Sequence, residues 1–122
     1  MTQSAGLLDE FSLLPENAAE AGVPADRLPR VERTTVPTPA GRVSAIRWGA
    51  GAPQVVLLHG GGQNAHTWDT VVLGLGMPAL CVDLPGHGHS DWREDSDCSP
   101  VVNAVTVSAA LDALGVTGVP VV

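Results

Sequence analysis

The alternation of apolar and polar residues divides most of the chain into short strands and amphipathic helices. Apolar or β-branched runs bounded by turn residues predict strands at residues 32–36, 42–48, 54–58, 78–84 and 116–122. Helical spacing of apolar residues predicts two helices: residues 66–75, with a buried stripe of Trp68, Val71, Val72 and Leu75, and residues 99–114, with Val102, Val105, Ala109 and Ala113 on one face. The first two strands flank a proline-rich turn and are expected to be antiparallel. The later strands alternate with helices and are expected to be parallel.

Cap residues mark the ends of the two predicted helices. Ser99 is a favoured N-cap, and Pro100 is a favoured first residue of a helix. Gly76 and Gly115 follow the last periodic residues, where glycine readily takes the left-handed conformation that closes a helix.

Residues 1–30 follow the pattern less closely. They contain a short apolar patch and one expected helix, residues 15–21, which Gly22 would close. This segment is either an arm particular to one protein family or a loose, disordered tail. We therefore divide the chain into an N-terminal arm, residues 1–30, and a folded domain, residues 31–122.

Length, composition and charge limit the possible classes of function. The chain has 122 residues, of which 44% are apolar, so it can build a packed core. A formal net charge of −7 and an aromatic content of 3% argue against a nucleic-acid partner, which needs basic groups for phosphates and rings for base stacking. Neither a secretory signal nor a membrane-spanning apolar run is visible, so a cytoplasmic protein without a membrane segment is expected. Cys81 and Cys98 are too few for a disulfide framework, and Cys81 is expected to be a small buried hydrophobe.

The most informative segment is the glycine-rich loop after the predicted strand 54–58. Gly60, Gly61 and Gly62 allow a sharp turn and leave backbone amides uncovered at the carboxyl end of that strand, where open α/β sheets bind their ligands. Such amides can stabilise an oxyanion during acyl transfer. His59, which precedes the glycines, is expected to hold the geometry of the loop rather than to act as a base or metal ligand.

Two other interpretations of the glycine loop stay open. The run 60–65 also satisfies the dinucleotide-binding pattern G-x-G-x-x-G/A, and Asp83 lies 23 residues beyond Gly60, at the end of the next strand. Two strands precede the loop, however, whereas a dinucleotide-binding fold usually begins with its fingerprint strand. The loop could also be a tight turn with no chemistry.

A second loop follows the predicted strand 78–84. Asp83 is expected to accept backbone N–H bonds that fix this loop, in which Gly86 and Gly88 permit unusual dihedral angles. His87 and His89 are a weak metal signal, and no metal ion or cofactor is expected. Ser90 has part of a nucleophile-elbow pattern, but residues 85–89 separate it from the strand, so we expect it to be structural.

Together the two loops resemble those of the α/β-hydrolase superfamily. In that family a loop containing His-Gly follows the third strand, and a D-x-x-G-x-G-x-S loop follows the fourth. The matching residues are His59-Gly60-Gly61 and Asp83-Leu84-Pro85-Gly86-His87-Gly88-His89-Ser90. The resemblance covers about residues 31–122 and implies the N-terminal half of an α/β-hydrolase sheet. It implies that the Gly61 amide, or alternatively that of Gly60 or Gly62, is an oxyanion-hole donor, with His59, Asp83 and Trp68 as scaffold residues of the site.

The family pattern also implies which catalytic groups these residues do not supply. The serine, acid and histidine of the triad come from the fifth strand onward in this fold, and no position here matches any of them. We therefore predict a hydrolase of esters or similar bonds in a small-molecule substrate, with its serine nucleophile beyond residue 122 and with the 122 residues inactive alone. An incompletely covered strand 54–58 would favour self-association. A dinucleotide-binding domain and a non-catalytic relic or interaction module are the alternatives.

Overall fold

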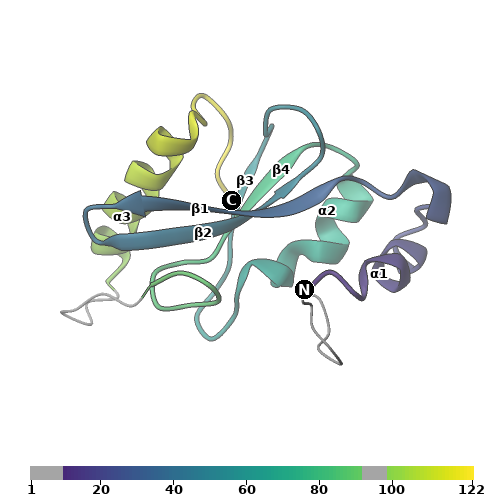
Figure 1. Cartoon of the computed structure of the whole chain (residues 1–122), viewed down its shortest axis with the longest axis horizontal. Coiled ribbons are helices and arrows are strands. Elements are labelled where there is room, and N and C mark those ends of the chain that lie inside the picture. Colours follow the sequence, from purple (N-terminus) through teal and green to yellow (C-terminus); the bar gives the residue numbers. More distant parts are fainter. Residues whose placement is uncertain (1–9, 92–98) are drawn as a thin grey trace.

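A mixed sheet forms the centre of the computed structural model, which describes residues 10–91 and 99–122 (Figure 1). Its strands are β1 (Val31–Thr38), β2 (Gly41–Trp48), β3 (Val56–Leu58) and β4 (Ala79–Val82), in the order β1-β2-β4-β3. β2 is antiparallel to both β1 and β4, whereas β3 and β4 are parallel. The predicted antiparallel start followed by a parallel β-α-β unit is therefore confirmed.

The predicted strand 116–122 is reduced to a single β-bridge. Val121 pairs with Val56 in parallel, on the side of β3 away from β4. Backbone hydrogen bonds of 2.8 Å join Leu58 to Val122 and Val122 to Val56. Pro120 has no N–H to donate, and Gly118 turns the chain at a φ of +71°, so a regular ladder does not extend further back. The segment nevertheless lies beside β3.

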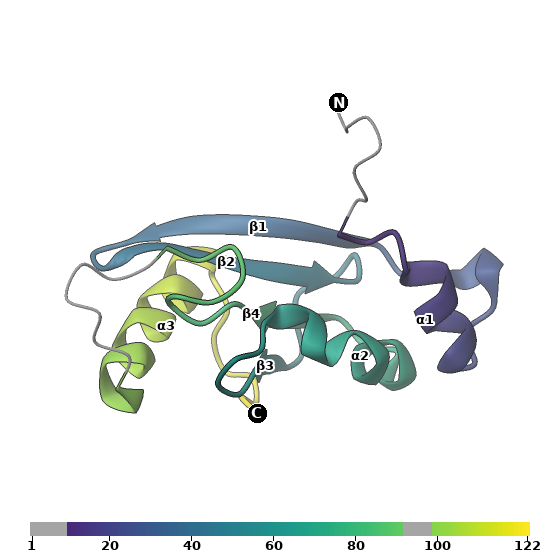
Figure 2. The ribbon, with the colours of Figure 1, turned by 90° about the horizontal axis from the view of Figure 1, so that it is seen from below.

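The helices cover the two faces of this sheet. They are α1 (Leu14–Glu20), α2 (Asp69–Leu75) and α3 (Pro100–Leu114), with short 3-10 turns η1 (Ala25–Arg27) and η2 (Ala65–Trp68). One apolar cluster joins α1 and α2 to one face, and a second joins α3 to the other face (Figure 2). Successive residues of β4 contribute to opposite clusters: Cys81 faces α2 and Leu80 faces α3. Both are fully buried, and burial raises the pKa of the Cys81 thiol to about 12. Cys98 lies outside the described residues.

The predicted helix boundaries are close to the observed ones because local cap chemistry sets them. The Ser99 hydroxyl accepts a hydrogen bond from the Val102 amide, and Pro100 is the first residue of α3. Gly76 and Gly115 are left-handed C-caps of α2 and α3. Gly22, also at positive φ, follows α1.

The predicted buried faces of α2 and α3 are wrong in part, although Val72 is buried and Trp68 packs against the core as predicted. On α2, Val71 and Leu75 are 46% and 47% exposed, whereas Val72 and Leu73 are buried. The helix begins as the tighter turn η2, which has about three residues per turn and so shifts the phase of the stripe.

On α3, Val105 is 68% exposed and Ala113 is also exposed, while Thr106, Val107 and Ala110 are buried. Valine and alanine occur all around α3, so spacing alone could not select its inner face. The buried Thr106 hydroxyl donates to the Val102 carbonyl at 3.2 Å, which removes the cost of burying it.

The described part of the N-terminal arm packs on the sheet. Ala18 of α1 is fully buried, and Phe11, Leu14, Val23 and Leu28 pack against the same apolar cluster as Trp48. A Schellman arrangement closes α1, with the Val23 amide bonded to the Ala18 carbonyl at 2.8 Å. Residues 1–9 lie outside the described range. No helix in the part of the chain that the structure describes is long and apolar enough to cross a membrane.

We predict that the 122-residue chain self-associates through the outer edge of its sheet. Val121 and Val122 are 53% and 63% exposed there, and an exposed apolar edge favours pairing with another chain. Val121→Lys should lower the association measured by sedimentation velocity. Val105→Lys, at an exposed valine of α3, is the control and should leave the association unchanged. A monodisperse wild-type monomer with one sharp thermal transition would contradict the prediction.

Candidate active site

Two loops meet at the carboxyl edge of the parallel strands. β3 and β4 are hydrogen-bonded neighbours, so the loops that follow them, residues 59–65 and 83–91, leave the sheet side by side. The sequence had singled out both loops. Their contacts with each other are made by two buried side chains, those of His59 and Asp83.

Asp83 is a fully buried carboxylate with a complete set of donors. Its Oδ1 accepts a 2.7 Å hydrogen bond from the Ala65 amide in the first loop. Its Oδ2 accepts 3.0 Å and 2.6 Å bonds from the His89 amide in the second loop and from Arg33 Nη1 on β1. A buried charge without a partner is strongly unfavourable, so the guanidinium and the two amides allow Asp83 to remain buried. Asp83 therefore connects both loops to the sheet.

His59 makes a second connection between the loops. Its Nε2 lies 3.0 Å from the Leu84 amide, which can only donate, so Nε2 must be the unprotonated nitrogen. Nδ1 then carries the proton and donates to the Gly60 carbonyl at 2.8 Å. With both nitrogens engaged and 5% of the residue exposed, His59 holds the loop backbone. The His87 ring packs against it at a centroid distance of 5.0 Å.

Ser90 ties the second loop to β2. Its hydroxyl donates to the Asp83 carbonyl at 2.6 Å and accepts from the Ser44 amide at 2.9 Å. Ser90 is 6% exposed, and these two bonds use its hydroxyl to hold the second loop. This agrees with the structural role expected from the residues that separate Ser90 from the strand. Asp91 continues the connection through hydrogen bonds to the backbone and side chain of Arg42.

The three glycines of the first loop are all exposed, but their amides differ in availability. The Gly60 amide donates to the side-chain oxygen of Gln63 at 3.0 Å. Gly62 has a φ of +74°, which favours glycine at that position. Neither the Gly61 amide nor the Gly62 amide makes a hydrogen bond with any part of residues 10–91 or 99–122. Within the described residues, both glycines thus carry an unpaired N–H near the carboxyl edge of the sheet.

Trp68 is half-buried at the end of η2 and packs against the apolar cluster that α1 and α2 share.

His66, also in η2, belongs to a charged cluster that sequence analysis missed. Arg33 Nε donates to Glu10 Oε2 at 2.8 Å, and Glu10 also lies 2.8 Å from His66 Nε2. These residues are separated by 23 and 56 positions, so no local motif connects them.

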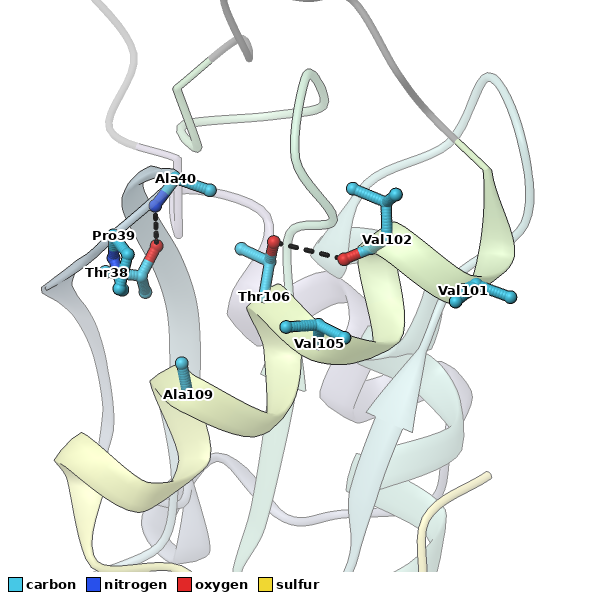
Figure 3. Close-up of a pocket in the computed structure, with 8 residues that line it drawn as sticks. All are labelled: Thr38, Pro39, Ala40, Val101, Val102, Val105, Thr106 and Ala109. Carbon is cyan, nitrogen blue, oxygen red and sulfur yellow. Dashed lines mark hydrogen bonds between the residues drawn. The ribbon is translucent and has the colours of Figure 1, made fainter.

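Two apolar cavities border α3. One, of about 550 Å³, is lined by Leu58, His59, Leu84 and Val121 together with one side of α3. The other, of about 410 Å³, lies between α3 and the β1–β2 turn, and its lining includes Val105 and Ala109 of α3 and Thr38 and Ala40 of the turn (Figure 3). Only the first cavity touches a residue of the two loops.

The geometry argues against the dinucleotide interpretation. Asp83 is fully buried and bonded to Arg33, so it cannot bind a ribose hydroxyl as that motif requires. For metals, the described residues contain no group of three or more His, Cys, Asp or Glu side chains that could hold an ion.

Gly88 provides a test of how closely the second loop fits Asp83. An added Cβ would lie 2.3 Å from Asp83 Cγ, and the φ of Gly88 is +51°. Gly118 has a φ of +71° but open space around its would-be Cβ in the described structure, so Gly118→Ala measures backbone strain alone. We expect that strain to cost about 1–2 kcal/mol in both variants, and the overlap to add about 1–3 kcal/mol in Gly88→Ala. Urea denaturation followed by tryptophan fluorescence measures both losses, and equal losses would contradict the close contact.

Comparisons with known proteins agree with this arrangement. The chain is 62% identical over 104 residues to Esterase Rv0045c of Mycobacterium tuberculosis, covering 85% of this chain and 33% of that protein. A crystal structure of that esterase superposes with a TM-score of 0.78 at 58% identity, over 94% of this chain and 38% of the other. The haloalkane dehalogenase DatA of Agrobacterium tumefaciens gives a TM-score of 0.65 at 28% identity, over 75% and 31% of the two chains.

Shorter matches include the pimeloyl-[acyl-carrier protein] methyl ester esterase of Aeromonas salmonicida, which is 46% identical over 59 residues, or 47% of this chain and 23% of that protein. The chain thus spans well under half the length of each of these relatives. The model of the alpha/beta hydrolase family matches residues 55–122, more than half of the chain. With the sheet order and the two loops described above, these matches show that the chain belongs to the α/β-hydrolase family.

Proposed function

We propose that the chain is the N-terminal part of an ester-hydrolysing catalytic domain and that its glycine loop supplies one donor of the oxyanion hole. The observation that carries this proposal is that the Gly61 amide, at the carboxyl edge of β3, has no hydrogen-bond partner among the described residues. When a carbonyl is attacked, negative charge develops on its oxygen, and a fixed N–H aimed at that oxygen lowers the barrier. Ester substrates are proposed because relatives of high identity are esterases.

Gly61 is favoured over Gly60 because the Gly60 amide already has a hydrogen-bond partner. The Gly60 amide is already bonded to the Gln63 side chain, which would have to leave before the amide could bind a substrate. The Gly62 amide is also unpaired within the described residues, so Gly62 remains the alternative donor, and Gly61 is proposed first because the family resemblance assigns the donor to the position after His59-Gly60. The role of Gly60 is then to form the turn, with the Gln63 amide 3.3 Å from its carbonyl.

His59 and Asp83 are proposed as scaffold residues rather than as reacting groups. Both His59 nitrogens and both Asp83 oxygens are occupied by neighbouring groups, so neither side chain can exchange a proton without breaking the loop contacts. Trp68 is proposed to support the helix that begins directly after the glycine loop, through its packing on the apolar core. Rigid support of this kind keeps a donor in place without reorganisation during the reaction.

The nucleophile is proposed to be a serine beyond Val122. Val121 already lies beside β3, so a chain continuing from that segment would emerge at the same edge as the glycine loop. A serine on a sharp turn there would place its reacting oxygen near Gly61, and the residue after it would supply the second donor. On this proposal the 122 residues have no esterase activity alone, because both the nucleophile and the second donor are missing.

The first test joins this chain to the missing part of a relative. The matching segment of Esterase Rv0045c is replaced by these 122 residues, which are 62% identical to it over 104 positions. We expect the hybrid to hydrolyse short p-nitrophenyl esters, while the 122-residue chain alone and the remainder of the esterase alone do not. A hybrid that folds by circular dichroism but has no activity would contradict the proposal, as would turnover by the 122 residues alone.

A second prediction isolates the Gly61 amide within the hybrid. Gly61→Pro removes the N–H, whereas Gly61→Ala keeps it and adds a Cβ that meets no described atom within 4 Å. We expect Gly61→Pro to lower kcat about 100- to 1,000-fold with little change in KM, because the donor acts mainly in the transition state. Gly61→Ala should stay close to wild type. Equal rates for the two variants would exclude Gly61 as the donor.

A further inference from the structure

Glu10, from the N-terminal arm, occupies a basic site between β1 and the start of η2. Its Oε2 accepts a 2.8 Å hydrogen bond from Arg33 Nε, and its Oε1 lies 2.8 Å from His66 Nε2. Residue 10, where the described chain begins, contacts η2, the turn that leads into α2 (Figure 1). Phe11 packs on the His66 ring at a centroid distance of 5.7 Å. One carboxylate thus joins the arm to both the sheet and the helix that follows the glycine loop.

The two partners of His66 require its imidazole to carry both protons. Nδ1 lies 2.7 Å from Asp69 Oδ2, and Nε2 lies 2.8 Å from Glu10 Oε1. A neutral imidazole has a single N–H and could donate to only one of two ionised carboxylates. The hydrogen bond to Asp69, and next the one to Glu10, raise the pKa of His66 despite partial burial.

From Glu10 the contacts continue without a gap to the candidate active site. Arg33 Nη1 donates to Asp83 Oδ2 at 2.6 Å and to Ser44 Oγ at 2.7 Å. Asp83 in turn accepts the amides of Ala65 and His89, one from each site loop. The charges alternate along the path, from Asp69 through His66, Glu10 and Arg33 to Asp83. Each bond along it is assisted by charge, and bonds of that kind are stronger and more directional than neutral ones.

We propose that Glu10 is a positioning residue for the oxyanion loop: by bridging Arg33 and His66 it fixes the Arg33–Asp83 pair and the start of η2, and so holds residues 59–65 in place. The consequence for catalysis depends on the function proposed above, but the bridge itself does not. Glu10 touches none of the atoms proposed to react, and its effect passes through Arg33 and Asp83. Loss of the bridge leaves Arg33 free to move at one end while Asp83 stays buried.

The bridge is stable only over the pH range in which both Glu10 and His66 are charged. Burial opposes ionisation of Glu10, but hydrogen bonds from Arg33 and His66 outweigh that effect and lower its pKa. Because its pKa is lowered, Glu10 contributes its full stabilisation above the ordinary pKa of glutamate, and that stabilisation is lost as the pH falls through the lowered value. Because its pKa is raised, His66 contributes its full stabilisation below the ordinary pKa of histidine, about 6.5, and that stabilisation is lost as the pH rises through the raised value.

The charged groups around His66 set this pH range together. Glu10 faces it from the arm and Asp69 from α2, while Arg33 of β1 binds the far side of the Glu10 carboxylate. Asp83 lies beyond Arg33 at the end of β4, and His89 of the second loop adds a favourable charge to Glu10. The bridge should therefore be complete between the ordinary pKa values of glutamate and histidine, about 4.3 and 6.5.

Glu10→Gln in the 122-residue chain tests the bridge without any activity measurement. The control is Glu20→Gln, at an exposed glutamate of α1. By NMR titration, the pKa of His66 should fall in Glu10→Gln and stay unchanged in Glu20→Gln. Amide hydrogen exchange at Ala65 and His89 should become about fivefold faster in Glu10→Gln alone. An unchanged His66 titration and unchanged exchange at both amides would overturn the proposal.

The esterase hybrid tests the consequence for catalysis. In the hybrid, Glu10→Gln should lower kcat by a larger factor than it raises KM. It should also move the alkaline decline of the pH–rate profile to lower pH, because the pKa of His66 falls. Glu20→Gln should have neither effect. A hybrid with no esterase activity would refute the proposed function but leave the His66 and exchange results to decide the bridge. An active hybrid whose kcat and pH profile are unaffected by Glu10→Gln would overturn the positioning role.

Discussion

The site depends on one buried carboxylate. Asp83 is fully buried at the end of β4, and its charge is compensated by Arg33 from β1 and by one amide from each of the two loops. Removing one partner of a buried ion pair typically costs about 3–5 kcal/mol, so each of these groups is strongly constrained to stay where it is. The positions of the hairpin, the glycine loop and the second loop are thereby linked to one another. Gly88 shows the closeness of the fit, because the space beside Asp83 admits no Cβ at that position.

This constraint explains how a loop of three glycines can present a fixed amide. Glycine allows the turn but supplies no side chain to hold it, so rigidity must come from neighbouring residues. His59 bonds across to Leu84, Gln63 folds back onto Gly60, and Asp83 holds Ala65 at the far end of the loop. Gly61 lies between these fixed points with its N–H unpaired in the described structure.

The features that could be predicted from the sequence are those set by residues close together in the chain, namely the helix ends and the two loops. Ser99, Gly76 and Gly115 located helix ends because cap residues act within one turn, and the two loop motifs placed His59 and Asp83 at strand ends, which the structure shows to be neighbours. The inner faces of α2 and α3 were predicted only in part, because a 3-10 turn shifted the phase of α2 and because apolar residues surround α3. The bridge from Glu10 through Arg33 to Asp83 could not be found, since it joins residues 23 and 50 positions apart that no motif relates.

The central claim is that these buried contacts place the Gly61 amide where an oxyanion forms. The most direct measurement is a crystal structure of the esterase hybrid with a phosphonate bound covalently to its nucleophile, because the phosphonyl oxygen occupies the position of the oxyanion. We predict that the Gly61 nitrogen lies about 2.7–3.1 Å from that oxygen, with the hydrogen bonds of His59 and Asp83 unchanged. A phosphonyl oxygen bound by other donors, with the Gly61 amide turned away from it, would show that Gly61 is not the donor.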